Sequence, residues 1–306
     1  MSEGLCFIGS LRDAISVFTA NAEKAREYND KRSLIYRGQS STSFSLRPSI
    51  FRKNRLGNEK AAIQELLRKA PLDFSGFSPL DTLIKMQHYE LPTRLLDFSF
   101  NPLVALYFAC LSPKEEKHKE DDGEIVAFYE SLEYADSPKG NKYARLAFYD
   151  GKTPDEFQSF FDIKDSLTIP FAKEGEDSVD RKQLAKYFSE KYLFISAPHN
   201  NERIRRQNGA FMLFGIDTNE RNPFIKTPFD YNKELLASQP DELLLHIVIP
   251  YPFKKTILHE LEAIGINKGF LFPELEHQAS YIREYLLDLD NQNEDDNPDE
   301  ESDDEQ

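Results

Sequence analysis

The sequence lacks several features that mark common protein classes. It contains no tryptophan and only two cysteines, Cys6 and Cys110. Disulfide-rich secreted domains carry many closely spaced cysteines, so we interpret both thiols as free and expect a reducing, cytoplasmic location. The longest apolar run, Leu103 to Leu111, has nine residues, against the ~20 that a membrane-spanning helix needs. Because no basic region precedes a long apolar stretch at the start, we expect neither secretion nor membrane insertion.

Motifs for several well-known chemistries are also missing. No G-x-S-x-G pattern and no phosphate-binding glycine loop occurs, and neither cysteine stands in an activating context. No second histidine lies at metal-ligand spacing from His88, so we predict no zinc site and no resident metal. The carboxylates Asp97, Glu274 and Glu276 leave a metal-dependent nuclease open as a weaker alternative.

Basic charge is scarce as well. The net charge is −15, and residues 291–306 contribute nine acids and no bases to it. We predict that residues 288–306 form a disordered acidic tail, which either solvates the chain or contacts a partner. The remainder is not basic enough for strong binding to duplex nucleic acid, but the cluster Arg203 to Arg206 suits an anionic ligand.

Hydrophobic residues make up 40% of the chain and aromatic residues 12%, which is enough for a packed core. Helical periodicity over residues 10–28 predicts an amphipathic helix, and Ser78 and Asn101 mark two further helix starts. Asn58 is the expected cap of another helix, and Gly209 and Gly265 are the expected stops of later ones. Strands are predicted at residues 33–36, 123–129, 192–197, 211–214 and 243–249.

These elements predict an α+β fold with an irregular mixed or antiparallel sheet flanked by helices. We expect a single domain over residues 1–287. Within it, residues 131–190 show weak periodicity and are assigned to an irregular, partly helical insertion, and residues 252–287 to C-terminal helices.

A polar segment, Gln87 to Asp97, lies between two apolar helices. One interpretation is structural, with Arg94 and Asp97 paired to tie the turn. The other is a site in which these groups meet a ligand. For His88 the same choice stands between a ring satisfied by backbone carbonyls and a catalytic role.

Several ordered blocks of the sequence resemble the FRG domain family over residues 32–110. They are Tyr36-Arg37-Gly38-Gln39, Leu46-Arg47-Pro48, Gln87-His88-Tyr89, Pro92 to Asp97, and Asn101-Pro102 through Ala109. The late segment Leu271 to Leu275 is similar to the C-terminal segment of many relatives. The resemblance implies a bacterial or viral protein that acts as a conditional effector in phage defence or a toxin system.

A second, partial similarity is to ADP-ribosyltransferases, which place Tyr-Arg-Gly on an early strand, a hydroxyl motif in the middle and a late glutamate. Tyr36-Arg37-Gly38, Ser99 and Glu274 or Glu276 follow that order. The similarity implies an ADP-ribosyltransferase-like fold with NAD, in which Arg37 holds phosphate and a carboxylate stabilises a positive ribose. The middle motif departs from the usual Ser-Thr-Ser, and the late glutamate follows Pro273 at a helix start.

Non-catalytic interpretations remain for individual residues. Glu274 is also expected at a helix N-terminus from the helix dipole alone. Arg37 can serve structure as a buried arginine bonded to Asp97. Arg203 and Gln207 either end a helix or line the same pocket as Arg37.

We predict that one pocket gathers these groups. The candidate catalytic residues are Arg37, His88, Asp97 and Glu274. The candidate ligand-binding residues are Tyr36, Gln39, Gln87, Tyr89, Thr93, Arg94, Ser99, Asn101 and Gln207. The expected function is a nucleotide-binding effector that transfers ADP-ribose from NAD or consumes NAD, acting on a small nucleotide or a protein target. The alternative is a non-catalytic module that senses a ligand or a phage component.

Overall fold

The computed structural model describes residues 5–28, 31–53, 55–149, 188, 192–198, 201–215 and 245–283. The predicted acidic tail, the boundary at residue 287 and residues 150–187 of the predicted insertion lie outside this part of the chain. Within it, no helix combines the length and the apolar character that a membrane crossing requires.

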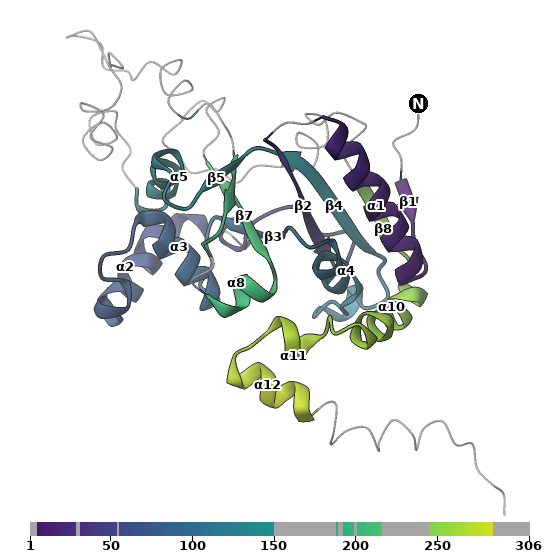
Figure 1. Ribbon diagram of the computed structural model, residues 1–306. Coiled ribbons are helices and arrows are strands. Elements are labelled where there is room, and N and C mark those ends of the chain that lie inside the picture. Colours follow the sequence, from purple (N-terminus) through teal and green to yellow (C-terminus); the bar gives the residue numbers. More distant parts are fainter. Residues whose placement is uncertain are drawn as a thin grey trace, which may run out of the picture.

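The strands form one mixed sheet in the order β1-β8-β4-β2-β3-β7-β6-β5 (Figure 1). Their bounds are β1 (Leu5–Phe7), β2 (Ser33–Gln39), β3 (Leu95–Ser99), β4 (Gly123–Glu130), β5 (Leu132–Tyr134), β6 (Tyr192–Ser196), β7 (Gly209–Phe214) and β8 (Leu245–Ile249). The two outer pairs are parallel and the inner pairs are antiparallel. The predicted α+β class with a mixed sheet is confirmed. Strands β1, β3 and β5 were not predicted: β1 and β5 have three residues each, which carry too little periodicity, and β3 overlaps the polar segment Gln87 to Asp97.

The helices alternate irregularly with the strands. They are α1 (Leu11–Glu27), α2 (Glu59–Lys69), α3 (Pro79–His88), α4 (Pro102–Cys110), α5 (Pro138–Ala144), α8 (Glu202–Arg206), α10 (Tyr251–Ala263), α11 (Lys268–Leu271) and α12 (Leu275–Ile282). Two predicted caps are confirmed, since Ser78 accepts from the Asp81 N–H and Asn101 accepts from the Leu103 N–H.

Helix α2 begins directly after Asn58, as predicted, but the cap bond is missing, and the predicted helix stop at Gly209 was wrong. The Asn58 side chain makes no cap hydrogen bond, because Asn58 already ends the 3₁₀ turn Leu56–Asn58 and its backbone is not extended as a capping residue requires. Gly209 is the first residue of β7, and the left-handed position after α8 is taken by Asn208, with φ of 46°. Asparagine tolerates this conformation better than most residues. Gly265, with φ of 86°, follows α10 as predicted.

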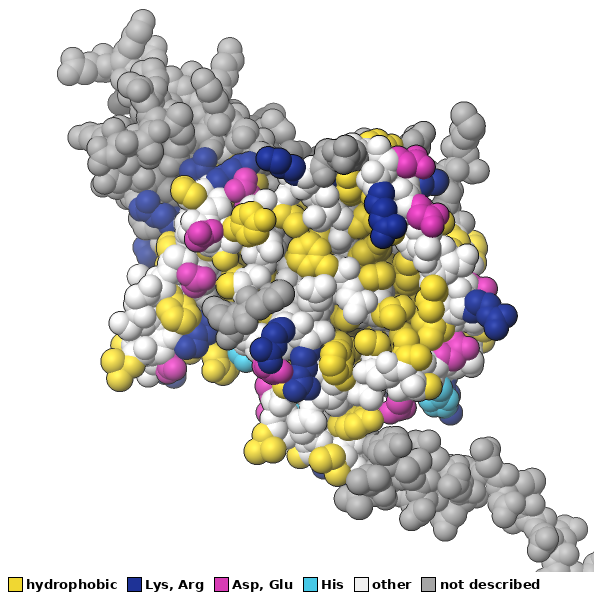
Figure 2. Space-filling model, in the orientation of Figure 1, with side chains coloured by type: hydrophobic (Ala, Val, Ile, Leu, Met, Phe, Trp, Pro, Cys, Tyr) yellow, Lys and Arg dark blue, Asp and Glu magenta, His cyan; other side chains and the backbone are white. Residues whose placement is uncertain are grey.

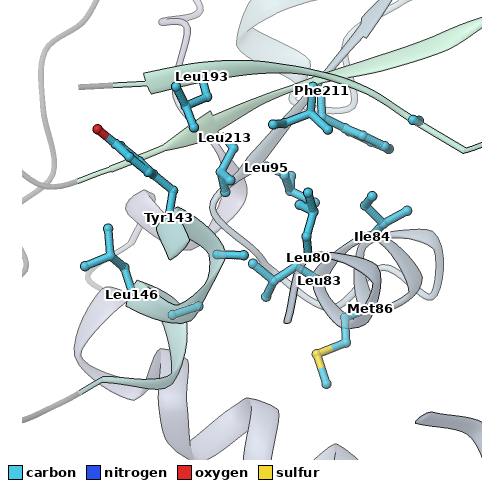
Figure 3. Packing of buried hydrophobic residues seen from close by; sticks show 14 of the residues in the cluster. Leu80, Leu83, Ile84, Met86, Leu95, Tyr143, Leu146, Leu193, Phe211 and Leu213 are labelled. Carbon is cyan, nitrogen blue, oxygen red and sulfur yellow. The ribbon is translucent and has the colours of Figure 1, made fainter. Parts of the chain in front are cut away.

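One face of the sheet is covered by two groups of helices (Figure 1). Helices α2, α3 and α5 cover β3, β7 and β6, and Figure 3 shows Leu80 and Leu83 of α3 lying close to Leu95 and Leu213 of the strands. Helices α1, α4 and α10 cover β2, β4 and β8. Helix α5 lies in the part of the predicted insertion that the structure describes, and it packs into the core that it shares with α2 and α3.

Helix α4 lies unusually close to the sheet. A Cβ atom on Gly38 of β2 would stand 1.8 Å from the Ala105 carbonyl oxygen, and one on Gly123 of β4 would stand 2.1 Å from that of Ala109. Glycine is required at both positions because no side chain fits between helix and strand. Gly38 therefore marks a close approach of helix to strand.

The opposite face carries a third apolar cluster. It joins strand residues such as Ile35, Phe128 and Met212 to the segment between β2 and α2, which contributes Leu46 and Ile50. Burial on both faces explains why the central strands read as nearly continuous apolar runs.

Candidate functional site

Backbone pairing between neighbouring strands is sparsest at the centre of the sheet, between β2 and β3. Strand β2 pairs with β4 along its whole length, but with β3 only at Tyr36 and Ser99. Beyond this pair the strands separate, and the Arg37 side chain fills the gap: its Nη1 donates to the Asp97 carbonyl oxygen at 2.6 Å. A guanidinium thus replaces the backbone donor that a continued ladder would supply.

A cavity of about 180 Å³ opens at this gap, and we call it the split-sheet cavity. It is lined by Tyr36, Arg37, Gly38, Asp97, Phe98, Ser99, Val104, Ala105, Phe108, Arg203 and Gln207. A smaller cavity of about 70 Å³ shares Asp97, Phe98, Arg203 and Gln207 with it and adds Gln87 and His88. The structure therefore brings Arg37, Gln87, His88 and Asp97, predicted from separate segments, to two adjoining hollows.

Arg37 keeps unused donors on the cavity side. Its Nε donates to Gln39 Oε1 at 3.4 Å and its Nη1 to the Asp97 carbonyl. Among the described residues, no acceptor contacts Nη2. Burial lowers the pKa of Arg37 to about 10, while the nearby Asp97 acts in the opposite direction. The side chain is still cationic at neutral pH, so it can hold an anion.

Arg203, on α8, is a second cation at the same place. Its guanidinium lies over the Phe272 ring, 4.7 Å from the centroid, and no carboxylate pairs with it in the part of the chain that the structure describes. In Figure 2, Lys and Arg side chains gather over the position of α8. Of these arginines, Arg205 and Arg206 pair with Glu202, which leaves Arg203 as the one that faces the cavities.

Side chains of the polar segment Gln87 to Asp97 form a connected hydrogen-bond network. Gln87 Nε2 donates to Asp97 Oδ2 at 3.1 Å, and Thr93 Oγ1 donates to Gln87 Oε1 at 2.5 Å. Thr93 also accepts from the Leu95 N–H and is buried, so it fixes the turn and does not line either cavity. Asp97 is exposed, with one carboxylate oxygen free of protein partners in the described residues.

His88 meets Glu274 at the edge of the smaller cavity. The His88 Nδ1 lies 3.7 Å from Glu274 Oε1, too far for a hydrogen bond, and this nitrogen and both Glu274 oxygens are buried without a hydrogen-bond partner. Burial lowers the pKa of His88, against the effect of Glu274, and Arg203 lowers it further. Glu274 borders His88 and lines neither cavity.

Arg94 is a structural residue, contrary to its predicted place in the ligand site. It is only 1% exposed and makes a two-point ion pair with Glu59 of α2, at 2.9 and 2.5 Å. Its remaining donors reach the carbonyls of Phe214 and Gly215. The pair with Asp97 that one interpretation offered is absent, because the Arg94 guanidinium, just before β3, is bound to Glu59, whereas Asp97 lies within β3 and accepts from Gln87.

Most of the other predicted ligand-binding residues also have structural partners. The Ser99 hydroxyl donates to the Gln207 carbonyl at 2.6 Å, and Asn101 caps α4. Gln39 is buried and donates to Glu124 Oε1 at 2.7 Å. Tyr36 packs against Phe18, and burial raises its pKa to about 12.

Two predicted ligand-binding residues lie at the edges of the site. Tyr89 is 64% exposed and lines a separate hollow beside α3. Gln207 lines both cavities at the gap, and its side chain donates to the Leu271 carbonyl at 3.1 Å. Gln207 thereby ties α8 to α11.

Among the residues that the structure describes, no cluster of three or more histidine, cysteine or acidic side chains forms a metal site. Both cysteines are free, and burial raises the pKa of Cys110 to about 12. A thiol so buried is not a nucleophile at neutral pH.

Comparison with known proteins gives one match. The family model of the FRG domain matches residues 32–118, the segment that supplies Arg37, Gln87, His88 and Asp97. No curated protein and no solved structure matches the chain. The chain therefore carries an FRG domain over residues 32–118.

Proposed function

We propose that the split-sheet cavity binds the phosphate groups of a nucleotide, and that the FRG-domain chain is a nucleotide-using effector with NAD as its substrate. The observation that supports this most directly is that two guanidinium groups, those of Arg37 and Arg203, face one cavity without a carboxylate partner among the described residues. Arginine binds phosphate through several donors at once, and such charge-assisted bonds are stronger than neutral ones.

The size of the cavity agrees with this role. About 180 Å³ is below the ~300–1,000 Å³ of pockets that enclose whole drug-sized ligands. The cavity suits a diphosphate and part of a ribose, with the rest of a dinucleotide outside it. Gln207 at its wall donates through Nε2 to the Leu271 carbonyl, and its side-chain carbonyl oxygen, which accepts no hydrogen bond from the described residues, would accept one from a ribose hydroxyl.

The reaction follows from the carboxylates beside the cavity. Cleavage of NAD breaks the bond between ribose and nicotinamide, the electron pair leaves with nicotinamide, and a positive charge develops on the ribose. Asp97, with a free carboxylate oxygen at the cavity, would stabilise that charge. His88, kept neutral by its lowered pKa, would take the proton from the attacking water or target group.

Glu274 supports His88 in this scheme. Its sheltered carboxylate would stabilise the imidazolium once His88 has taken a proton. In that role it is a positioning residue and does not touch the substrate. The role of effector in bacterial or phage conflict belongs to the same proposal and derives from the family resemblance, and the proposed contact of the acidic tail with a partner derives from its charge.

Nicotinamide release from NAD by the purified protein tests this function. We expect release by the native chain, its loss in Arg37→Gln and Asp97→Asn, and a partial loss in Glu274→Gln. Glu276→Gln is the matched control, since Glu276 is an exposed acid on the same helix. No release, together with an unchanged melting temperature in millimolar NAD, would contradict the proposal.

One observation favours a second function, a ligand sensor without catalysis. Glu274 does not line either cavity at the gap, and its oxygens are shielded. A sensor would bind the nucleotide without turnover, and Glu274→Gln would leave binding intact, whereas Arg37→Ala or Asp97→Ala would weaken it.

A further inference from the structure

A larger cavity of about 590 Å³ lies beside the split-sheet cavity, and we call it the C-terminal cavity. It lies among the ends of α4 and α10 and the C-terminal helices α11 and α12, which Figure 1 shows below the sheet. It is lined by Glu90, Tyr107, Leu111, Lys114, Arg203, Leu258, His259, Glu262, Ile266, Asn267, Lys268, Phe272, His277 and Tyr281.

Arg203 connects the three cavities. It lines the C-terminal cavity, the split-sheet cavity and the small cavity beside His88. A ligand whose phosphate is held by Arg203 can therefore extend to either side of this guanidinium. The volume on the C-terminal side falls within the range that encloses a drug-sized molecule.

The C-terminal cavity has aromatic walls. The Phe272 ring carries the Arg203 guanidinium on one side and lies 5.2 Å from the His277 ring, centroid to centroid. Tyr107 and Tyr281 add two more rings to the lining. Aromatic side chains stack on the flat faces of nucleobases, and an arginine over a ring extends the same platform.

Its polar groups are mixed in charge. Lys114, Arg203 and Lys268 are basic, and Glu90 and Glu262 are acidic. Two of these groups already have protein partners, since Lys268 donates to Ser280 and Glu262 accepts from the Tyr281 hydroxyl. A cavity with apolar rings, donors and acceptors suits a planar heterocycle better than a multiply charged group.

We propose that the C-terminal cavity binds the nucleoside part of the nucleotide, with its base against Phe272 and its phosphate directed to Arg203. This inference rests on the proposed phosphate site and deepens it: the substrate class becomes a nucleotide whose base is enclosed by α10, α11 and α12. The FRG segment then supplies the phosphate end of the site, and the C-terminal helices supply the base end.

Calorimetric titration with pyrophosphate, ADP and adenosine tests the inference on the full chain. We expect ADP to bind roughly tenfold or more tighter than pyrophosphate, since stacking of one base contributes about that much. Phe272→Leu keeps an apolar side chain but removes the ring, so it should lower ADP affinity much more than pyrophosphate affinity, which changes only through the lost contact between the ring and Arg203. His277→Ala is a second, milder variant with the same expected direction.

Phe270→Leu is the matched control. Phe270 is on α11, two residues before Phe272, and it is 42% exposed and outside the cavity lining. The substitution should change neither affinity. Equal affinities of the native chain for ADP and pyrophosphate, or unchanged ADP binding in both Phe272→Leu and His277→Ala, would overturn the inference and leave the phosphate site standing. Absence of pyrophosphate binding would overturn both.

Discussion

Arg37 and Arg94 are two arginines of the FRG segment with opposite surroundings. Arg94 is enclosed and saturated by Glu59 and two carbonyls, whereas Arg37 keeps donors open to a cavity. The sequence could not separate them, because the partner of Arg94 lies 35 residues away on α2. Sequence patterns placed Arg37 after a strand and Arg94 in a polar turn, and they allowed each of the two to pair with Asp97.

Removal of either partner of the buried pair should destabilise the chain strongly. Glu59→Gln leaves the Arg94 charge buried without a counter-ion, which costs about 3–5 kcal/mol. Urea unfolding followed by circular dichroism would show the loss as a lower midpoint. Glu65→Gln, which removes an exposed acid of α2 that pairs with Arg68, is the control and should shift the midpoint little. Equal midpoints for the two variants would contradict the structural role of Arg94.

The pKa of the His88 imidazole should depend on its two charged neighbours, Glu274 and Arg203. Because Glu274 raises its pKa and Arg203 lowers it, Glu274→Gln should lower the pKa of His88 further, and Arg203→Gln should raise it. Two-dimensional NMR of the histidine ring protons against pH would measure both shifts, with His88→Gln to assign the signal. Shifts of the same sign in the two variants would exclude this arrangement.

The same lowered pKa affects stability. The folded state takes up the His88 proton at a lower pH than the unfolded chain, whose histidine has a pKa near 6.5. The unfolded state therefore binds more protons just below pH 6.5, and the contribution of His88 to the free energy of unfolding falls as the pH falls through that window.

At the scale of elements, the contact between α4 and β2 organises the site. Helix α4 has no polar side in its sequence, which is typical of a helix buried on all sides. Its close approach at Gly38 holds β2 in place while β3 diverges, and the gap follows from this. The divergence itself was not predictable, because Tyr36 and Ser99 are 63 residues apart and no local pattern encodes where two strands stop pairing.

Gly38→Ala should be strongly destabilising. Its Cβ would stand 1.8 Å from the Ala105 carbonyl oxygen, so α4 or β2 must move. Overpacking of this kind costs about 1–3 kcal/mol or more, and thermal unfolding would show it. Gly57→Ala is the matched control, since nothing lies within 4 Å of its added Cβ, and it should be neutral or stabilising by up to about 1 kcal/mol. Similar melting temperatures for the two variants would contradict the packing of α4.

At the scale of the whole molecule, the candidate site is assembled from distant parts of the chain. The FRG match ends at residue 118, yet Arg203, Gln207 and Glu274 come from beyond it. Sequence patterns predicted the main helices and the strands β2, β4, β6, β7 and β8, since their periodicity is local, but they did not predict the central strand β3. They offered Arg203 only as one of two interpretations, a helix end or a pocket residue, because which arginine of α8 faces a cavity depends on the position of α11.

The account depends on Arg37 and Arg203 holding the same anion. Calorimetric titration of pyrophosphate into the native chain, Arg37→Gln, Arg203→Gln and the control Arg205→Gln tests this most directly, since Arg205 is an exposed arginine of the same helix that pairs with Glu202. We predict that each of the first two variants loses affinity roughly tenfold or more, as expected for a charge-assisted hydrogen bond, and that the control binds as the native chain does. Pyrophosphate binding that is equal in all four proteins, or absent from the native chain, would contradict the account.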